Sequence, residues 1–153
     1  MYQNKDHTNQ KHIVTKSNNI DISNHKSLLE VTKKISKFIR QGDNLYLTGE
    51  LGVGKTTFAK SIINDLQYKN NINKTEVLSP TFSILNEYQI NNLNVKHYDL
   101  YRIRQEEELA NLSLFEEKDA INIIEWPEIL KSYKIKNIKF DFKYSSNLSL
   151  IHI

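Results

Sequence analysis

The stretch Gly49-Glu50-Leu51-Gly52-Val53-Gly54-Lys55-Thr56 matches the pattern G-x-x-x-x-G-K-S/T of a phosphate-binding P-loop. Residues 44–48 before it are short, apolar and partly aromatic, as expected of a buried strand. After it, apolar residues recur at helical spacing between residues 57 and 66. Three of the chain's four glycines lie in this stretch, so the match does not come from a glycine-rich composition. We therefore predict a P-loop between a strand and a helix.

The residue types of this stretch suit a polyphosphate ligand. Glycines adopt backbone angles that are closed to other residues, so successive N–H groups can face phosphate oxygens at a helix N-terminus. We expect Lys55 to reach the β- and γ-phosphates and the Thr56 hydroxyl to bind Mg²⁺. The expected nucleotide-binding set is Glu50, Leu51, Gly52, Val53, Gly54, Lys55, Thr56 and Thr57.

Length and composition bound the class of protein. A chain of 153 residues has the size of one domain, and we expect a flexible extension at residues 1–11 before a single domain at residues 12–153. Because there is no cysteine, disulfides and cysteine-based zinc sites are excluded. Residues 1–11 lack the apolar core of a signal peptide, and no apolar run approaches the roughly 20 residues that span a bilayer. We expect a soluble, cytoplasmic protein with no membrane partner.

The charge pattern does not indicate a nucleic-acid-binding surface. The net charge of +3 permits an acidic partner, but the basic residues are nearly all lysines. No basic block is interleaved with aromatic residues, as in proteins that bind single strands. The histidines are scattered without metal-ligand spacing, so we assign none of them to a metal.

Periodicity predicts the other elements. Residues 24–40 carry a helical stripe of apolar residues, with Ser23 or Asn24 as the N-cap and Gly42 as the end. The polar residues 67–74 are expected to form a surface connection. The remaining expectations are an edge strand at 12–16, two extended pieces around Pro80 at 77–88, strands at 93–98 and 120–124, helical turns at 105–111, 112–117 and 127–130, and a hairpin at 138–153.

Two acidic residues are candidates for the second half of the site. A P-loop site usually needs an acid at the end of a buried strand, which holds Mg²⁺ directly or through water. Glu125 follows the apolar run 121–124, and Asp99 follows residues 95–98. We favour Glu125 as the acid beside Mg²⁺ and Asp99 as the residue that orients the attacking water or shares the metal. The reverse assignment stays open.

Three further residues have a functional and a structural interpretation each. Trp126, the only tryptophan, could stack on the nucleotide or a partner, or be a core aromatic residue. Thr81 could sense the γ-phosphate or be an ordinary turn residue, and Arg102 could neutralise phosphate charge or pair with an acid. The candidate catalytic residues are Lys55, Asp99, Glu125 and Thr81, the metal candidates are Thr56, Glu125 and Asp99, and Trp126 joins the nucleotide-binding set.

Four segments follow one another along the chain: residues 49–57, Ser79-Pro80-Thr81-Phe82, Asp99-Leu100-Tyr101-Arg102 and Glu125-Trp126-Pro127-Glu128. In this order and spacing they resemble the bacterial TsaE family, small ATPases needed for threonylcarbamoyladenosine modification of tRNA. The last three segments are much more specific than a P-loop alone, and the resemblance extends over residues 12–153. It implies an α/β, P-loop NTPase-like, three-layer fold with a mixed parallel and antiparallel sheet.

The resemblance also implies an activity and partners. It implies Mg²⁺-dependent ATP hydrolysis and docking onto the TsaB and TsaD subunits of a tRNA-modifying complex, with tRNA as an indirect partner. Hydrolysis in that family resets the transferase complex between turnovers and is expected to be weak without the partners. The implied roles are Lys55 and Thr56 on phosphates and Mg²⁺, Glu125 near the metal, Asp99 and Thr81 in the catalytic or switch region, Trp126 beside the nucleotide or the partner, and residues 23–25 near the adenine.

Three other functions share the P-loop. A GTPase needs a D-x-x-G glycine, yet no glycine follows Gly54, and the nearest N-K-x-D match, residues 73–76, ends in the wrong acid. A small-molecule kinase usually clamps phosphates with several arginines, and only Arg102 and Arg104 lie at a suitable position. A nucleotide-gated binding module without significant turnover is the non-enzyme alternative, with aromatic residues as interface anchors.

Overall fold

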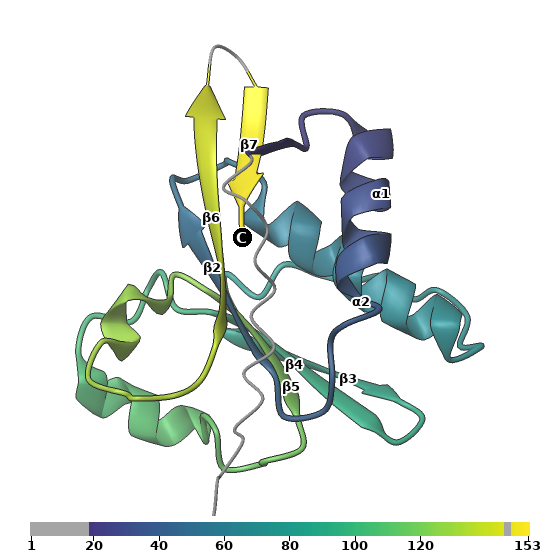
Figure 1. Ribbon diagram of the computed structural model, residues 1–153. Helices are drawn as coiled ribbons and strands as arrows, with labels where there is room; N and C mark the ends of the chain where they lie inside the picture. The colour runs from purple at the N-terminus through teal and green to yellow at the C-terminus, as the bar shows by residue number, and fades with distance from the viewer. Residues whose placement is uncertain (1–18, 146–147) are drawn as a thin grey trace, which may run out of the picture.

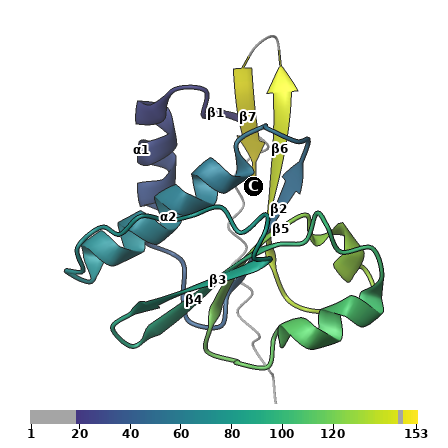
Figure 2. The same ribbon diagram turned by 180° about the vertical axis from the view of Figure 1, so that it is seen from behind.

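The computed structural model describes residues 19–145 and 148–153, so the expected extension at 1–11 and the edge strand at 12–16 lie outside the described residues. The described chain is an α/β arrangement around a seven-stranded mixed sheet (Figures 1 and 2). The elements are β1 (Ile20–Asp21), α1 (His25–Ile35), β2 (Asn44–Gly49), α2 (Lys55–Lys69), β3 (Leu85–Ile90), β4 (Leu93–Asp99), η1 (Glu106–Leu112), β5 (Ile121–Glu125), η2 (Pro127–Leu130), β6 (Ile138–Ser145) and β7 (Leu148–His152).

The sheet has a parallel centre and antiparallel edges. Its strand order is β1-β7-β6-β2-β5-β4-β3, in which β6, β2, β5 and β4 run parallel to one another. The strand β3 is antiparallel to β4 at one edge, and β7 and β1 continue antiparallel beyond β6 at the other. The mixed sheet predicted from the sequence is therefore confirmed. In such sheets ligands bind at the carboxyl ends of the parallel strands.

The sheet separates two apolar clusters, which gives the three layers. Leu45 and Leu47 of β2 are fully buried in the cluster that includes Phe58 of α2, whereas Tyr46 belongs to the cluster that includes Leu109 of η1. Figures 1 and 2 show α1 and α2 on one side of the sheet and the green segment of η1 on the other. The central strands are apolar on both faces because both faces are covered. No helix in the described residues is long and apolar enough to cross a membrane.

The helix α1 begins where the sequence predicts and ends earlier. The side chain of Asn24 caps it by accepting a hydrogen bond from the Ser27 N–H at 2.9 Å. It ends at Ile35 rather than near residue 40, because the N–H groups that follow bond to a carbonyl three residues back instead of four. One example is the bond from the Phe38 N–H to the Ile35 carbonyl at 2.9 Å. Gly42 (φ +82°) lies beyond, in a separate turn before β2.

Two other segments differ from the sequence-based expectation. The helix α2 continues to Lys69. The sequence places Gln67 in a surface connection, but Gln67 is buried and its side chain is bonded to Thr75. The connection therefore begins only after the helix. In 77–88 only the part after Pro80 forms a strand, β3. The Ile84 N–H bonds to the Pro80 carbonyl at 2.6 Å, so the residues between them form a turn. Residues 77–79, before this turn, are not part of a strand.

Candidate active site

The P-loop backbone connects β2 to α2 in angles that favour glycine. Gly49, Gly52 and Gly54 have φ values of +135°, +77° and +112°. A Cβ at Gly49 would lie 2.4 Å from the Phe142 carbonyl oxygen, so a side chain there would collide with the backbone of β6. The N-terminus of α2 receives no side-chain cap, because Gly54 is its N-cap residue. Its first N–H groups are therefore of the kind that bind phosphate oxygens.

Lys55 is held at the base of this loop. Its Nζ donates hydrogen bonds to the Gly49 carbonyl at 2.7 Å and to the Glu50 carbonyl at 2.8 Å. The same Nζ lies 3.9 Å from the centre of the Trp126 ring, a cation–π distance. The residue is only 4% exposed. An ammonium group in this position is fixed beside the N-terminus of α2, as a phosphate-binding lysine must be.

Nearby acids offset the burial of the Lys55 charge only in part. Burial lowers the pKa of its ammonium group below the usual value, while the carboxylates of Glu125, Glu128 and Asp99 act in the opposite direction. A polyphosphate ligand would add further negative charge and favour the protonated form. A bound polyphosphate would therefore oppose the burial that lowers this pKa.

Glu125, the last residue of β5, is buried beside the P-loop. Its Oε2 accepts a hydrogen bond from the Thr56 hydroxyl at 2.8 Å. Its Oε1 lies 2.8 Å from Nε2 of His97, a fully buried residue of β4. The carboxylate is thus bonded at both oxygens, and one of them reaches the hydroxyl that closes the P-loop motif.

Asp99, the last residue of β4, lies directly across from Glu125 in the register of the two parallel strands. Its Oδ2 accepts a hydrogen bond from the Thr81 hydroxyl at 2.9 Å, and its Oδ1 accepts one from the Tyr101 N–H at 3.0 Å. Asp99 is 4% exposed and Glu125 2% exposed. Two buried carboxylates and two threonine hydroxyls therefore meet at the carboxyl ends of neighbouring strands.

These residues enclose a cavity of about 220 Å³. Tyr101 and Trp126 both line the cavity, and the centres of their rings are 4.9 Å apart. Trp126 has a left-handed backbone (φ +58°), which follows directly on the end of β5. The cavity is lined by Leu51, Gly52, Gly54, Lys55, Thr56, Thr57, Thr81, Asp99, Tyr101, Glu125 and Trp126.

The donor set fits Mg²⁺ held together with a nucleotide. Among the described residues, no three His, Cys, Asp or Glu side chains gather in a way that would hold a metal by themselves. Mg²⁺ usually binds through one or two carboxylates and substrate phosphates, and it retains water ligands. The Thr56 hydroxyl and the carboxylates of Glu125 and Asp99 are the groups that could supply protein ligands of this kind.

Comparison with known proteins decides the family. The family model described as "Threonylcarbamoyl adenosine biosynthesis protein TsaE" matches residues 22–149. The chain belongs to the TsaE family. It is 42% identical over 110 residues to the tRNA threonylcarbamoyladenosine biosynthesis protein TsaE of Rickettsia felis, covering 67% of this chain and 60% of that protein.

Other relatives agree. The TsaE protein of Rickettsia typhi is 39% identical to the chain over 114 residues, covering 72% of this chain and 74% of that protein. The TsaE protein of Bacillus subtilis is 36% identical over 106 residues, covering 67% of this chain and 64% of that protein. The chain thus spans less than two thirds of the length of the R. felis and B. subtilis proteins. A crystal structure of B. subtilis YdiB has the same fold, with a TM-score of 0.65 at 24% identity over 90% of this chain and 84% of that one.

Most residues that the sequence singles out lie together in this TsaE-family chain. The lining of the cavity includes every candidate catalytic and metal-binding residue. Glu50 is exposed and contributes its carbonyl to Lys55, while the Val53 side chain is buried in the core. Arg102 does not line the cavity, and its guanidinium lies 6.0 Å from the centre of the Phe82 ring.

One residue of the site was missed from the sequence. His97 was assigned no role, yet it contacts Glu125 from the neighbouring strand. The signal was its position two residues before Asp99, since residues at this spacing in a strand point to the same face. The order of the strands, which places β5 beside β4, is what brings the two side chains together.

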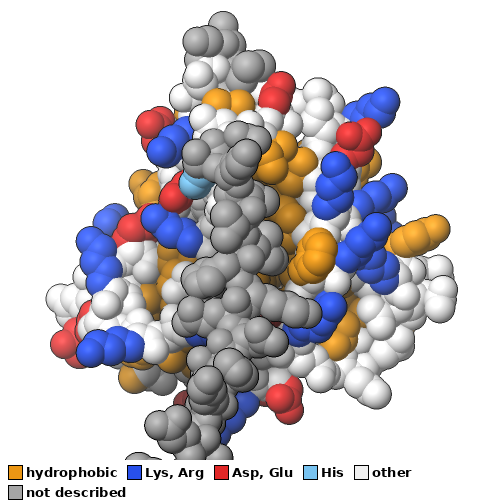
Figure 3. Space-filling view, viewed as in Figure 1, with side chains coloured by type: hydrophobic (Ala, Val, Ile, Leu, Met, Phe, Trp, Pro, Cys, Tyr) orange, Lys and Arg blue, Asp and Glu red, His pale blue; other side chains and the backbone are white. Residues whose placement is uncertain are grey.

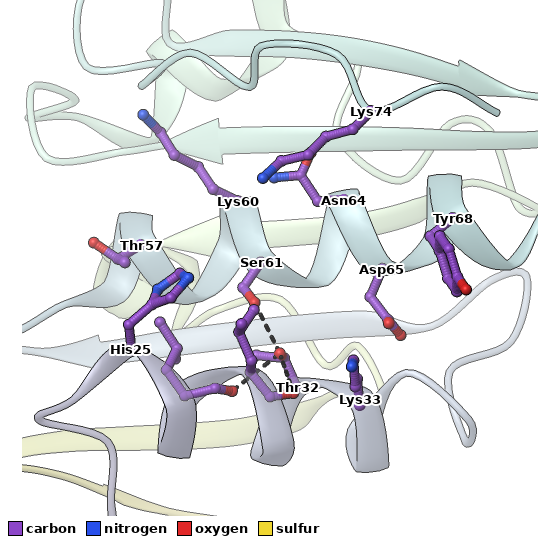
Figure 4. Close-up of a pocket in the computed structure, with 12 residues that line it drawn as sticks. His25, Thr32, Lys33, Thr57, Lys60, Ser61, Asn64, Asp65, Tyr68 and Lys74 are labelled. Atoms are coloured by element: carbon purple, nitrogen blue, oxygen red, sulfur yellow. Dashed lines mark hydrogen bonds between the residues drawn. The ribbon is translucent and has the colours of Figure 1, made fainter.

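A second cavity, of about 320 Å³, lies between α1 and α2 (Figure 4). Thr57 lines both cavities, and His25 lies near Thr57 at the start of α1. His25 belongs to residues 23–25, which the family resemblance implies to lie near the adenine, and it is close to the P-loop helix α2. A buried bond of 2.8 Å between the Thr32 and Ser61 hydroxyls joins the two helices here. On the face seen in Figure 3, Lys and Arg side chains lie both on the side that carries α1 and α2 and on the opposite side.

Proposed function

We propose that this protein is a Mg²⁺-dependent ATPase that supports threonylcarbamoyladenosine modification of tRNA. The observation that carries the proposal is the meeting of the P-loop residues Lys55 and Thr56 with two buried carboxylates, Asp99 and Glu125, at the ends of adjacent parallel strands. Phosphoryl transfer needs positioning and charge stabilisation rather than covalent chemistry, and these groups supply both. Family membership gives the pathway in which such an ATPase would act.

Each residue has a role in this proposal. Lys55 and the N–H groups at the start of α2 would bind the phosphates, and Thr56 and Glu125 would hold Mg²⁺, which neutralises charge on the phosphate oxygens when bound. Asp99 would orient the attacking water or share the metal. Thr81, bonded to Asp99, would respond to the γ-phosphate. Trp126 and Tyr101 would exclude water from one side of the cavity.

The proposed partners are the TsaB and TsaD subunits, and tRNA is contacted through them. Large apolar side chains near the cavity support docking of a protein there, since Leu51 is 71% and Phe82 88% exposed. A partner that contacts this rim would sense whether the cavity holds ATP or ADP, which suits a resetting role between turnovers of the transferase. A reaction that uses ATP and tRNA would take place in the cytoplasm.

The experiment is a measurement of phosphate release from ATP by the purified chain, alone and with TsaB and TsaD. Small hydroxyl compounds are screened in parallel as phosphate acceptors. We expect slow hydrolysis that rises when both partners are added and that requires Mg²⁺. Phosphate transferred to an acceptor, with no response to the partners, would replace the ATPase by a kinase. Absence of hydrolysis with both partners present would leave only a nucleotide-gated binding module.

A further inference from the structure

His97 of β4 is a buried neighbour of Glu125. It is 0% exposed, and its Nε2 lies 2.8 Å from Oε1 of Glu125. A carboxylate can only accept hydrogen bonds, so Nε2 carries the proton of this bond. The other ring nitrogen, Nδ1, has no hydrogen-bond partner among the described residues. The bond to Glu125 is therefore the one polar interaction that fixes the ring in the described structure.

We propose that His97 is a positioning residue that orients the Glu125 carboxylate toward Thr56. With Oε1 held by His97, the other oxygen faces the Thr56 hydroxyl at 2.8 Å, on the side of the cavity. His97 itself does not line the cavity, so it acts through Glu125 and does not touch the nucleotide. The inference rests on the proposed ATPase function, because it says which residue orients Glu125, the acid proposed to lie beside Mg²⁺.

The physical reason is the freedom of a glutamate side chain. Three rotatable bonds separate the Glu125 backbone from its carboxylate, and one hydrogen bond leaves several orientations open. A second, buried bond on the opposite oxygen selects one orientation and is not displaced by water, because both partners are buried (His97 0% and Glu125 2% exposed). Residues that orient a metal ligand in this way typically change metal affinity or activity by about 10- to 100-fold when removed.

The test compares three substitutions that differ in where they place a donor. The amide nitrogen of His97→Gln can reach the position of Nε2, whereas that of His97→Asn is too short, and His97→Leu has no donor. We expect His97→Gln to retain turnover within about 3-fold, and His97→Asn and His97→Leu to lower kcat by about 10-fold or more. Far-UV circular dichroism and thermal unfolding establish that each variant is folded.

Two measurements separate positioning from a structural role. ADP binding with and without Mg²⁺ needs no turnover, and we expect the gain in affinity from Mg²⁺ to fall in His97→Asn and to persist in His97→Gln. In a Glu125→Gln background, His97→Asn should cause no further loss, because the residue acts through Glu125. Equal losses in all three His97 variants, or a wild-type Mg²⁺ effect in His97→Asn, would overturn the inference. Absence of ATP hydrolysis by the wild type, with Mg²⁺-dependent ADP binding intact, would instead overturn the proposed function alone.

Discussion

Asp99 and Glu125 lie opposite each other at the ends of two adjacent parallel strands, and each carboxylate accepts a hydrogen bond from a threonine. The threonine of Glu125 is Thr56, the hydroxyl residue of the P-loop motif, whereas that of Asp99 is Thr81, in the turn before β3. This difference favours Glu125 as the acid beside Mg²⁺ in the proposed mechanism. Asp99 then remains for the attacking water.

Substitution of either acid should separate binding from turnover. We expect Glu125→Gln and Asp99→Asn to retain nucleotide binding through Lys55 and the P-loop backbone, and to lower kcat by about 10²- to 10⁴-fold. The measurements are steady-state ATP hydrolysis and equilibrium ADP binding. Glu107→Gln is the matched control, because Glu107 is an exposed acid of η1 outside the cavity lining. Wild-type turnover in Glu125→Gln would remove Glu125 from the mechanism.

Trp126 should report on ligand binding at the cavity. It is the only tryptophan of the chain, and its ring lies 3.9 Å from the Lys55 ammonium nitrogen. A phosphate that draws Lys55 away from this ring would change the surroundings of the indole. We expect a saturable change in tryptophan emission on addition of Mg²⁺ and ATP, and none in Lys55→Ala. An unchanged spectrum at concentrations where calorimetry detects binding would contradict the assigned contact.

Gly49 should be intolerant of any side chain. Its φ is +135°, and a Cβ would lie 2.4 Å from the Phe142 carbonyl oxygen. We expect Gly49→Ala to lower the free energy of unfolding by more than about 2 kcal/mol, measured by urea denaturation. Gly54→Ala is the control, since Gly54 has φ +112° but no heavy atom within 4 Å of a Cβ. Equal losses in the two variants would mean that backbone strain alone, without the collision, sets the cost.

Tyr98 should make stability depend on alkaline pH. Burial, with smaller contributions from Glu87, Glu117 and Glu116, raises its pKa from 10.0 to about 12. Since the folded pKa lies above the unfolded one, the contribution of Tyr98 to stability is complete below about pH 10 and is lost as the pH rises through about 12.

The variant Tyr98→Phe removes this pH dependence. The hydroxyl of Tyr98 has no hydrogen-bond partner among the described residues. Its removal at neutral pH should therefore change the free energy of unfolding by less than about 1 kcal/mol. Between pH 10 and 12 the wild type should lose more stability than the variant. Tyr68→Phe is the control, because Tyr68 is 78% exposed. A wild-type pH profile in Tyr98→Phe would contradict the assignment.

Local patterns in the sequence predicted the elements that carry the site. The P-loop, its strand and helix, and the cap at Asn24 depend on residues within a few positions of one another. Glu125 and Asp99 were singled out because acids at the ends of apolar strands stand out in the sequence, and each is the last residue of its strand. The family resemblance supplied the mixed sheet, which the strand order confirms.

Contacts between distant segments could not be predicted in the same way. The early end of α1 and the turn after Pro80 depend on bonds and packing that periodicity does not encode. The contact of His97 with Glu125 requires that β4 pairs with β5 in one register, and pairing order is not visible in either strand alone. For this reason the sequence singled out Glu125 but not its neighbour His97.

The most direct test of the central claim is calorimetric titration of the purified chain with ATP, with and without Mg²⁺, in the wild type and in Lys55→Ala. The P-loop site predicts one saturable binding site per chain that is strengthened by Mg²⁺. It also predicts that Lys55→Ala loses binding while its circular dichroism and unfolding temperature persist. Undiminished ATP binding by a folded Lys55→Ala variant, or no binding by the wild type, would contradict the assignment of this cavity to ATP.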